Sequence, residues 1–330
     1  MSEPICRALI AITLALAAVT AHAQGLIRAQ VSAPGSTAFI VTTHLASVLK
    51  QRHGYNLEVA TGFPGVRSMI NNAKYETELS IYAPALAFFL NSKSAMFKTL
   101  EEHAELSSRL RPLFTYEGDL FTMGSLDPSI RSVADIEGKR VYLGPKGAAL
   151  VNINAGLIEA ATGLKANEDY ELVHVDWAGS AALLQDGTVD VLFQLCAPGC
   201  ATWTEISAAR KVYFVGYTDE MIARESFQKA LKFPGRTIKR IAVGTWGANQ
   251  GNEAPIQVVG EFTGLLANDR LPDEVAYNIT KAFWETKDDL AKIAPFAHGF
   301  DIKDAAFGMI NTIHPGAARY LKEQGVTLPR

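Results

Sequence analysis

Short apolar runs and helically spaced apolar residues alternate along the first quarter of the chain. Strands are expected at 26–32, 56–60 and 78–82, and each is followed by a turn rich in Gly, Pro, Ser or Thr. After the first turn, Val41, Leu45 and Leu49 recur at helical spacing, and Gly54 closes that helix. A β-turn-α unit repeated three times predicts a parallel sheet with helices on its faces.

The pattern then changes and later resumes. Residues 111–116 and 120–125 look like two strands around Glu117-Gly118-Asp119, which has the composition of a hairpin turn. Further strands are expected at 139–143, 170–175, 189–195 and 211–216. This second run predicts a second α/β domain.

The last part of the chain is expected to return to the first domain. Residues 256–267 form an extended apolar crossing, 272–293 an amphipathic helix, and two helices follow near 304–310 and 315–324. We expect two lobes joined by two extended crossings, with the ligand in the cleft between them. The expected lobes are 24–125 with 256–330, and 126–255.

Composition excludes a nucleic-acid partner. The chain has 330 residues, 48% hydrophobic and 20% charged, and a formal net charge of -3. Its densest basic cluster, at 236–240, contains only three cationic side chains.

The N-terminus has the features of a targeting segment. Arg7 precedes an apolar run at 8–19, and Ala21-His22-Ala23 is a small-x-small cleavage site. The run is shorter than the roughly 17–25 residues that span a bilayer. We therefore expect a signal peptide over 1–23 and an exported mature chain from Gln24.

Two cysteines remain once Cys6 has left with the signal peptide. Cys196 and Cys200 flank the loop C-A-P-G-C and are candidates for a disulfide in an exported protein. Their spacing differs from the C-x-x-C of redox enzymes. Because no Cys/His cluster accompanies them, no metal site and no cofactor are expected.

A central stretch carries a candidate polar-ligand site. Ser132 is expected to cap a short helix, 139–143 forms a strand, and a turn at 144–147 leads into a helix. Such a corner presents free backbone N–H groups to whatever lies above it. An ordinary β-turn-α corner explains the same pattern without a ligand.

Several segments resemble one family of transport receptors. Residues 132–144, S-V-A-D-I-E-G-K-R-V-Y-L-G, resemble an element common in type II periplasmic binding proteins. The segments 34–37 and 60–62 resemble the first two ligand loops of one branch, and 186–190, D-G-T-V-D, matches a turn of the same family. Residues 313–325, I-H-P-G-A-A-R-Y-L-K-E-Q-G, are similar to the terminal element of the TAXI family, the solute receptors of tripartite ATP-independent periplasmic (TRAP) transporters.

The resemblance implies a function as well as a fold. It implies a type II periplasmic binding protein-like fold and a non-catalytic, monomeric periplasmic receptor. Its partners would be a small polar solute, an organic acid or amino acid-like molecule, and the membrane permease subunits of a TRAP transporter. A sensor for a membrane kinase remains an alternative. An exported enzyme is less favoured, because the expected cleft loops contain Asp176 as their sole acid and lack a nucleophile paired with a base.

The expected cleft loops supply the candidate ligand-binding residues. Ser36 and Thr37 either cap a helix or contact the ligand, and Tyr82 either stacks on a ligand or is a half-buried strand residue. Trp177 is interpreted as a wall or lid, and Lys146 as an anion partner or a solvated lysine. The full set is Ser36, Thr37, Phe39, Thr61, Gly62, Tyr82, Lys146, Gly147, Ala148, Trp177 and Gln194. His314 is expected to be structural, at a helix start before Pro315.

Overall fold

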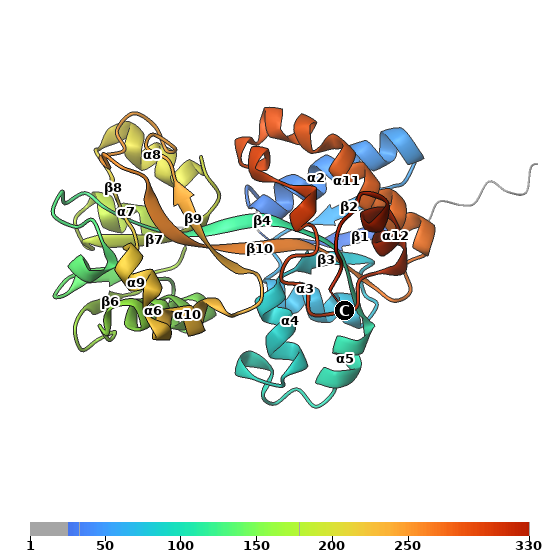
Figure 1. Cartoon of the computed structure of the whole chain (residues 1–330), viewed down its shortest axis with the longest axis horizontal. Coiled ribbons are helices and arrows are strands. Elements are labelled where there is room, and N and C mark those ends of the chain that lie inside the picture. The colour runs from blue at the N-terminus through green and yellow to red at the C-terminus, as the bar shows by residue number, and fades with distance from the viewer. Residues whose placement is uncertain (1–25, 33, 178, 330) are drawn as a thin grey trace, which may run out of the picture.

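Two lobes joined by two long strands make up the molecule (Figure 1). The computed structural model describes residues 26–32, 34–177 and 179–329. The expected signal peptide at 1–23 lies outside the described residues. Among the described residues, no helix combines the length and the apolar character needed to cross a membrane.

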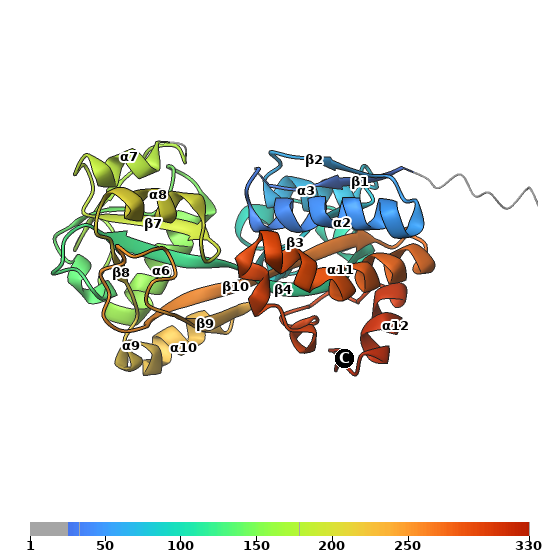
Figure 2. The ribbon, with the colours of Figure 1, turned by 90° about the horizontal axis from the view of Figure 1, so that it is seen from above.

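The first lobe is built on three parallel strands in the order β2-β1-β3. Its strands are β1 (Ile27–Gln30), β2 (Leu57–Ala60) and β3 (Leu79–Tyr82). Its helices are α2 (Thr37–His53), α3 (Gly65–Ala73), α4 (Pro84–Asn91), α5 (His103–Arg109), α11 (Asp273–Ile293) and α12 (Pro315–Glu323). The three β-turn-α units are confirmed, and α2 and α11 lie side by side (Figure 2).

Local sequence signals explain where α2 begins and ends. The Ser36 hydroxyl accepts a hydrogen bond from the Phe39 amide at 3.3 Å, so Ser36 is the N-cap. Gly54 adopts a left-handed conformation with φ of 68°, and its amide bonds back to the last turn.

The second lobe is also built on three parallel strands, in the order β7-β5-β6. Its strands are β5 (Arg140–Tyr142), β6 (Glu171–Val173), β7 (Val191–Cys196), β8 (Tyr213–Val215) and β9 (Arg236–Ile241). Its helices are α6 (Ala149–Thr162), α7 (Ser180–Gln185), α8 (Ala201–Ala209), α9 (Asp219–Ala223) and α10 (Glu225–Leu231). The sequence interpretation missed α9, α10 and β9.

The two crossings are β4 (Leu110–Ser125) and β10 (Ile256–Asn268), which pair antiparallel. The return crossing is confirmed, but the expected hairpin at Glu117-Gly118-Asp119 is wrong, because β4 is one continuous strand. Gly118 and Asp119 together oppose the single residue Glu261 on β10. The sequence that resembles a turn therefore forms a β-bulge.

The boundary between the hydrophobic cores of the two lobes lies in the middle of these crossings. The first-lobe core draws on 27–116 and 265–326, whereas the second-lobe cores draw on 120–259. Tyr116 and Leu265 belong to the first-lobe core, and Leu120 and Val259 belong to cores of the second. Each crossing strand thus contributes to both lobes, and the bulge lies where one lobe gives way to the other.

The helix expected near 304–310 is wrong. A short 3-10 turn at Ile302–Asp304 is followed by turns, and Gly308 has a left-handed φ of 72°. A β-carbon at Gly308 would lie 2.5 Å from the Gly235 amide nitrogen. The close approach of these two backbones excludes the helix that the local pattern favours.

Candidate functional site

A cavity of about 590 Å³ lies between the lobes, beside the crossing strands. The first lobe contributes Ser36, Leu86 and Phe89 to its lining, and the second contributes Ala148, Trp177 and Gln194. The crossings supply Asp119, Glu261 and Thr263. Because both lobes and both crossings line it, a change in the angle between the lobes would change its shape.

Two carboxylates from the bulge border this cavity. The Thr37 hydroxyl at the start of α2 donates a hydrogen bond to Asp119 Oδ1. Glu261 Oε1 lies 3.7 Å from Nε of Arg236 on β9. The bulge brings Asp119 and Glu261 to the same side of the cavity, as bulges beside functional sites commonly re-aim side chains.

Burial shifts the titration of both carboxylates. It raises the pKa of Asp119 to about 6, although the Thr37 hydrogen bond opposes the shift. Burial also raises the pKa of Glu261, where Arg236 opposes the rise and the nearby Asp119 adds to it. The cavity therefore contains two acids that ionise less readily than free carboxylates.

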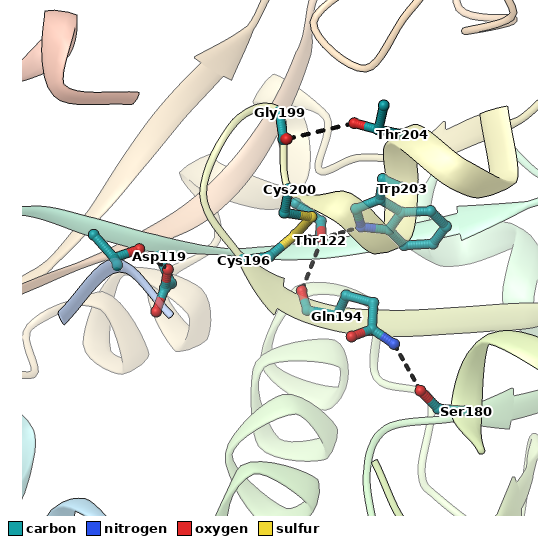
Figure 3. Close-up of a disulfide and its surroundings, with 10 residues drawn as sticks. Asp119, Thr122, Ser180, Gln194, Cys196, Gly199, Cys200, Trp203 and Thr204 are labelled. Atoms are coloured by element: carbon teal, nitrogen blue, oxygen red, sulfur yellow. Dashed lines mark hydrogen bonds between the residues drawn. A yellow bond between two sulfur atoms is a disulfide. The ribbon is translucent and has the colours of Figure 1, made fainter. Parts of the chain in front are cut away.

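Trp177 and Gln194 form part of the second-lobe wall. The Trp177 side chain is 42% exposed, and its ring meets Tyr142 edge to face at 5.9 Å. Gln194 Nε2 donates to the Ser180 hydroxyl at 2.9 Å, and the Gln194 backbone carbonyl accepts from Thr122 at 2.8 Å (Figure 3). These contacts fix the position of Gln194 within β7.

A disulfide joins Cys196 and Cys200, whose Cα atoms are 5.9 Å apart (Figure 3). It closes the loop between β7 and α8, just after the cavity-lining residues Gln194 and Leu195. Trp203, fully buried on α8, donates its indole N–H to Thr122 on β4 at 2.7 Å. The disulfide and this hydrogen bond hold the loop against the crossing strand.

The structure brings together some of the residues that the sequence singles out. Ser36, Ala148, Trp177 and Gln194 line the cavity. Gly147 lines an adjoining cavity of about 510 Å³. Thr37 is 3% exposed and contacts Asp119 instead of lining the cavity itself.

Other expected residues lie elsewhere. Phe39 is partly buried in a small cluster with Val31 and Ile81. Thr61 and Gly62 are exposed and are not among the residues that line the cavity. Lys146 is likewise exposed and outside that lining, so the expected anion partner is not at the cavity.

The position of Tyr82 corrects the sequence interpretation. Its side chain is fully buried in the first-lobe core, and its hydroxyl accepts a hydrogen bond from the Ile310 amide at 3.0 Å. Burial raises the pKa of Tyr82 to about 12. The preceding residue on β3, Ile81, lines the cavity, and because successive side chains of a strand point to opposite faces, the Tyr82 ring points into the core.

Sequence reasoning misses the two acids at the cavity. The local pattern places Asp119 in a turn and Glu261 in an apolar crossing, which leaves Asp176 as the sole cleft acid. Asp176 instead accepts a hydrogen bond from the Gly179 amide at 2.8 Å, ahead of α7. The short E-G-D segment inside a long apolar run is the one local signal for the bulge, and it fits a turn equally well.

The described residues contain no group of three or more His, Cys, Asp or Glu side chains that could hold a metal ion. The acids at the cavity instead have neighbours of other kinds. Asp119 has a hydroxyl beside it and Glu261 has a guanidinium. These features describe a pocket that can bind a polar molecule by charge and hydrogen bonds.

Comparison with known families shows to which family the chain belongs. The NMT1-like family matches residues 33–325, and the chain belongs to this family. It is accordingly a solute-binding protein and not an enzyme.

Solved structures show the same fold. A structure described as a periplasmic transporter has 20% sequence identity and a TM-score of 0.54, with 92% of this chain and 95% of that chain covered. This likeness establishes a periplasmic binding protein-like fold.

Two further structures are more distant. The periplasmic sulfonate-binding protein SsuA from Methylobacillus flagellatus is 14% identical, with a TM-score of 0.48 over 81% of this chain and 69% of that one. A TRAP periplasmic solute-binding protein from Desulfovibrio desulfuricans, with bound sn-glycerol-3-phosphate, is 16% identical, with a TM-score of 0.45 over 91% and 89%.

Proposed function

We propose that this protein is a periplasmic receptor of the TAXI type, which captures a small polar solute and delivers it to the permease of a TRAP transporter. The observation that carries the proposal is the cavity of about 590 Å³ lined by both lobes and both crossings. A solute held there contacts both lobes at once, so its binding free energy favours the closed arrangement.

The site residues in this proposal are those that border the cavity. Ser36 and Gln194 supply hydrogen-bonding groups, Ala148 lies at the start of α6, and Trp177 covers apolar parts of the solute. The expected preference for a carboxylate rests on Lys146, on helix N-termini and on the family resemblance, and Lys146 is not among the residues that line the cavity. The proposal therefore requires a polar solute but no acid.

A thermal-shift screen tests the proposal. The mature chain is refolded to remove any co-purified molecule and then mixed with a panel of dicarboxylates, 2-oxo acids, amino acids, amines and sugars. A ligand at 100 times its dissociation constant stabilises the folded state by about 2.7 kcal/mol. We expect at least one class to raise the melting temperature, and Trp177→Ala to weaken that effect. A well-folded chain that responds to no class and carries no small molecule from the cell contradicts the proposal.

A further inference from the structure

The charge of Asp119 is the least compensated at the cavity. Its carboxylate receives one hydroxyl hydrogen bond, from Thr37, and it forms no ion pair with any residue that the structure describes. Asp119 nevertheless lines the cavity. A partly buried carboxylate without a cation gains from a positively charged partner, which restores the interactions lost with water.

The neighbouring cations are already engaged with other acids. Arg236 Nε lies 3.7 Å from Glu261, and Lys239 Nζ lies 2.8 Å from Glu117. Where the crossings meet, the described residues thus include three carboxylates (Asp119, Glu261 and Glu117) and two cations paired with them, Arg236 and Lys239. Once all three carboxylates are ionised, an anionic solute placed here would meet one surplus negative charge.

The rest of the cavity lining is mainly apolar. Leu86, Phe89 and Met96 contribute from the first lobe, and Ile153 and Trp177 from the second. Phe89, Met96 and Ile153 also line the adjoining cavity of about 510 Å³, so the apolar surface continues beyond the first cavity, where Arg236 borders it. A solute that fills this space gains by burying an apolar body.

We propose that the solute is an organic amine, whose protonated nitrogen pairs with Asp119 while its apolar body lies between the Phe89 and Trp177 walls. This inference rests on the proposed function and names the chemical class that the same cavity selects. Glu261 lies beside the nitrogen, and Gln194 offers its amide from the other wall. A charge-assisted hydrogen bond to Asp119 orients the solute.

The pH dependence of binding gives a second signature. A cation binds the ionised carboxylate, and burial raises the pKa of Asp119 to about 6, so affinity for an amine should increase between roughly pH 5 and 7. The groups facing Asp119 are Thr37 on α2 and Glu261 on β10, with Arg236 beyond Glu261. On β4 itself, Tyr116 stays neutral in this range, because burial raises its pKa.

The test compares probes that differ only in their head group. Binding of 2-phenylethylamine, 2-phenylethanol and 3-phenylpropanoate to the refolded mature chain is measured by calorimetry at pH 7.5. A second set of probes carries the same three head groups on a hexyl chain instead of the phenyl-bearing one. We expect the amines to bind at least about tenfold more tightly than the alcohols and the acids. This comparison uses the unmodified protein, so it does not depend on the folding of a variant.

A matched pair of variants then tests whether the preference for amines depends on Asp119. Asp119→Asn keeps the shape of the side chain and the acceptor for Thr37, and it should reduce amine affinity at least about tenfold. Asp288→Asn makes the same charge change at a site on α11 that is 84% exposed, and it should leave affinity unchanged. Circular dichroism verifies that both variants are folded.

The outcomes separate this inference from the proposed function. If acids or sugars of the panel bind and amines do not, or if Asp119→Asn leaves amine affinity unchanged, the amine inference is wrong and the receptor function stands. If the folded chain binds no class at all, both fail.

Discussion

The hydroxyl of Thr37 donates a hydrogen bond to the carboxylate of Asp119, and so ties the first turn of α2 to the bulge in β4. Thr37 is 3% exposed, so the contact is shielded from water. It links the helix start of the first lobe to the strand that crosses into the second. The hydrogen bond offsets part of the cost of burying the carboxylate, and the remainder appears in its raised pKa.

Asp119→Asn should raise stability at neutral pH. The folded protein holds a proton on Asp119 up to about pH 6, whereas the unfolded chain releases it near the ordinary value of 3.8. The contribution of Asp119 to the free energy of unfolding is therefore fully present below pH 3.8, falls as the pH rises from 3.8 to about 6, and levels off above about pH 6. Because Asn cannot ionise, the variant should gain about 1–3 kcal/mol at pH 7.5 and little near pH 4.

Urea unfolding at the two pH values checks this expectation, with Asp288→Asn as the control. Asp288 is exposed and hydrogen-bonded by Lys287, which lowers its pKa, so its replacement should have only a small effect. A loss of stability in Asp119→Asn at pH 7.5 would mean that the ionised carboxylate stabilises the fold.

Gly118→Ala should disturb the bulge. A β-carbon at this position would lie 2.7 Å from the Thr263 methyl group and 2.9 Å from the Glu261 carbonyl oxygen. We expect a loss of roughly 1–3 kcal/mol in the free energy of unfolding. Affinity for the solute should fall as well, because Glu261 and Thr263 line the cavity.

Gly156→Ala is the matched control, and urea unfolding compares the two variants. Gly156 lies inside α6, and no atom of a neighbouring element lies within 4 Å of the position that an added β-carbon would take. Alanine favours the helix, so this variant should gain up to about 1 kcal/mol. Equal stability of the two variants would show that the β-bulge tolerates a side chain.

Local signals explain how much of the fold the sequence could predict. The cap at Ser36, the left-handed Gly54 and Pro84 at the first turn of α4 each act within a few residues. The strands and helices around them were therefore predictable to within a few positions. The absence of a helix at 304–310 was not predictable from local sequence, because Gly308 packs against the distant Gly235.

The candidate site was less predictable, because it depends on contacts between distant segments. Asp119 and Glu261 meet only through the pairing of β4 with β10. Nothing near Asp119 in the sequence separates a bulge from a hairpin. Trp177 and Gln194 were predictable because Trp177 follows β6 and Gln194 lies near the end of β7, where strand ends face the cleft. Tyr82 also ends a strand, but it points into the core.

Trp177→Ala should weaken solute binding and leave the fold intact. The side chain lines the cavity and is 42% exposed, so more than half of it is buried, in part against Tyr142. Loss of this aromatic wall should reduce affinity about tenfold or more, and loss of its buried area should lower the free energy of unfolding by roughly 1–3 kcal/mol without unfolding the chain. Calorimetry and urea unfolding measure the two effects, and Trp177→Phe should retain most of the affinity. Unchanged affinity in the alanine variant would remove Trp177 from the site.

His314→Ala should have the opposite effect. His314 is 1% exposed, its Nε2 donates to the Leu271 carbonyl at 2.8 Å, and its Nδ1 accepts from the Gly316 amide at 3.3 Å. Losing both bonds and the ring should cost roughly 2–4 kcal/mol. His314→Asn keeps an acceptor for the helix start and should cost less. Affinity measured on the folded fraction should not change; a well-folded variant that binds nothing would contradict a structural role.

The disulfide between Cys196 and Cys200 should resist alkylation and contribute modestly to stability. In protein isolated from the periplasm, iodoacetamide should add no mass until a reductant is present, and two labels afterwards. The bond closes a loop with a sequence separation of 4, and the chain-entropy relation gives about 2 kcal/mol for so short a loop.

Replacing both cysteines, Cys196→Ser with Cys200→Ser, should therefore lower the urea midpoint without unfolding the chain at 25 °C, since the Trp203 indole still bonds Thr122 on β4. The reduced wild-type protein provides the control and should unfold at nearly the same midpoint as the double variant. Two thiols that react before reduction would show that the mature protein carries free cysteines at this loop. A double variant as stable as the oxidised protein would show instead that the loop is held by the Trp203 contact alone.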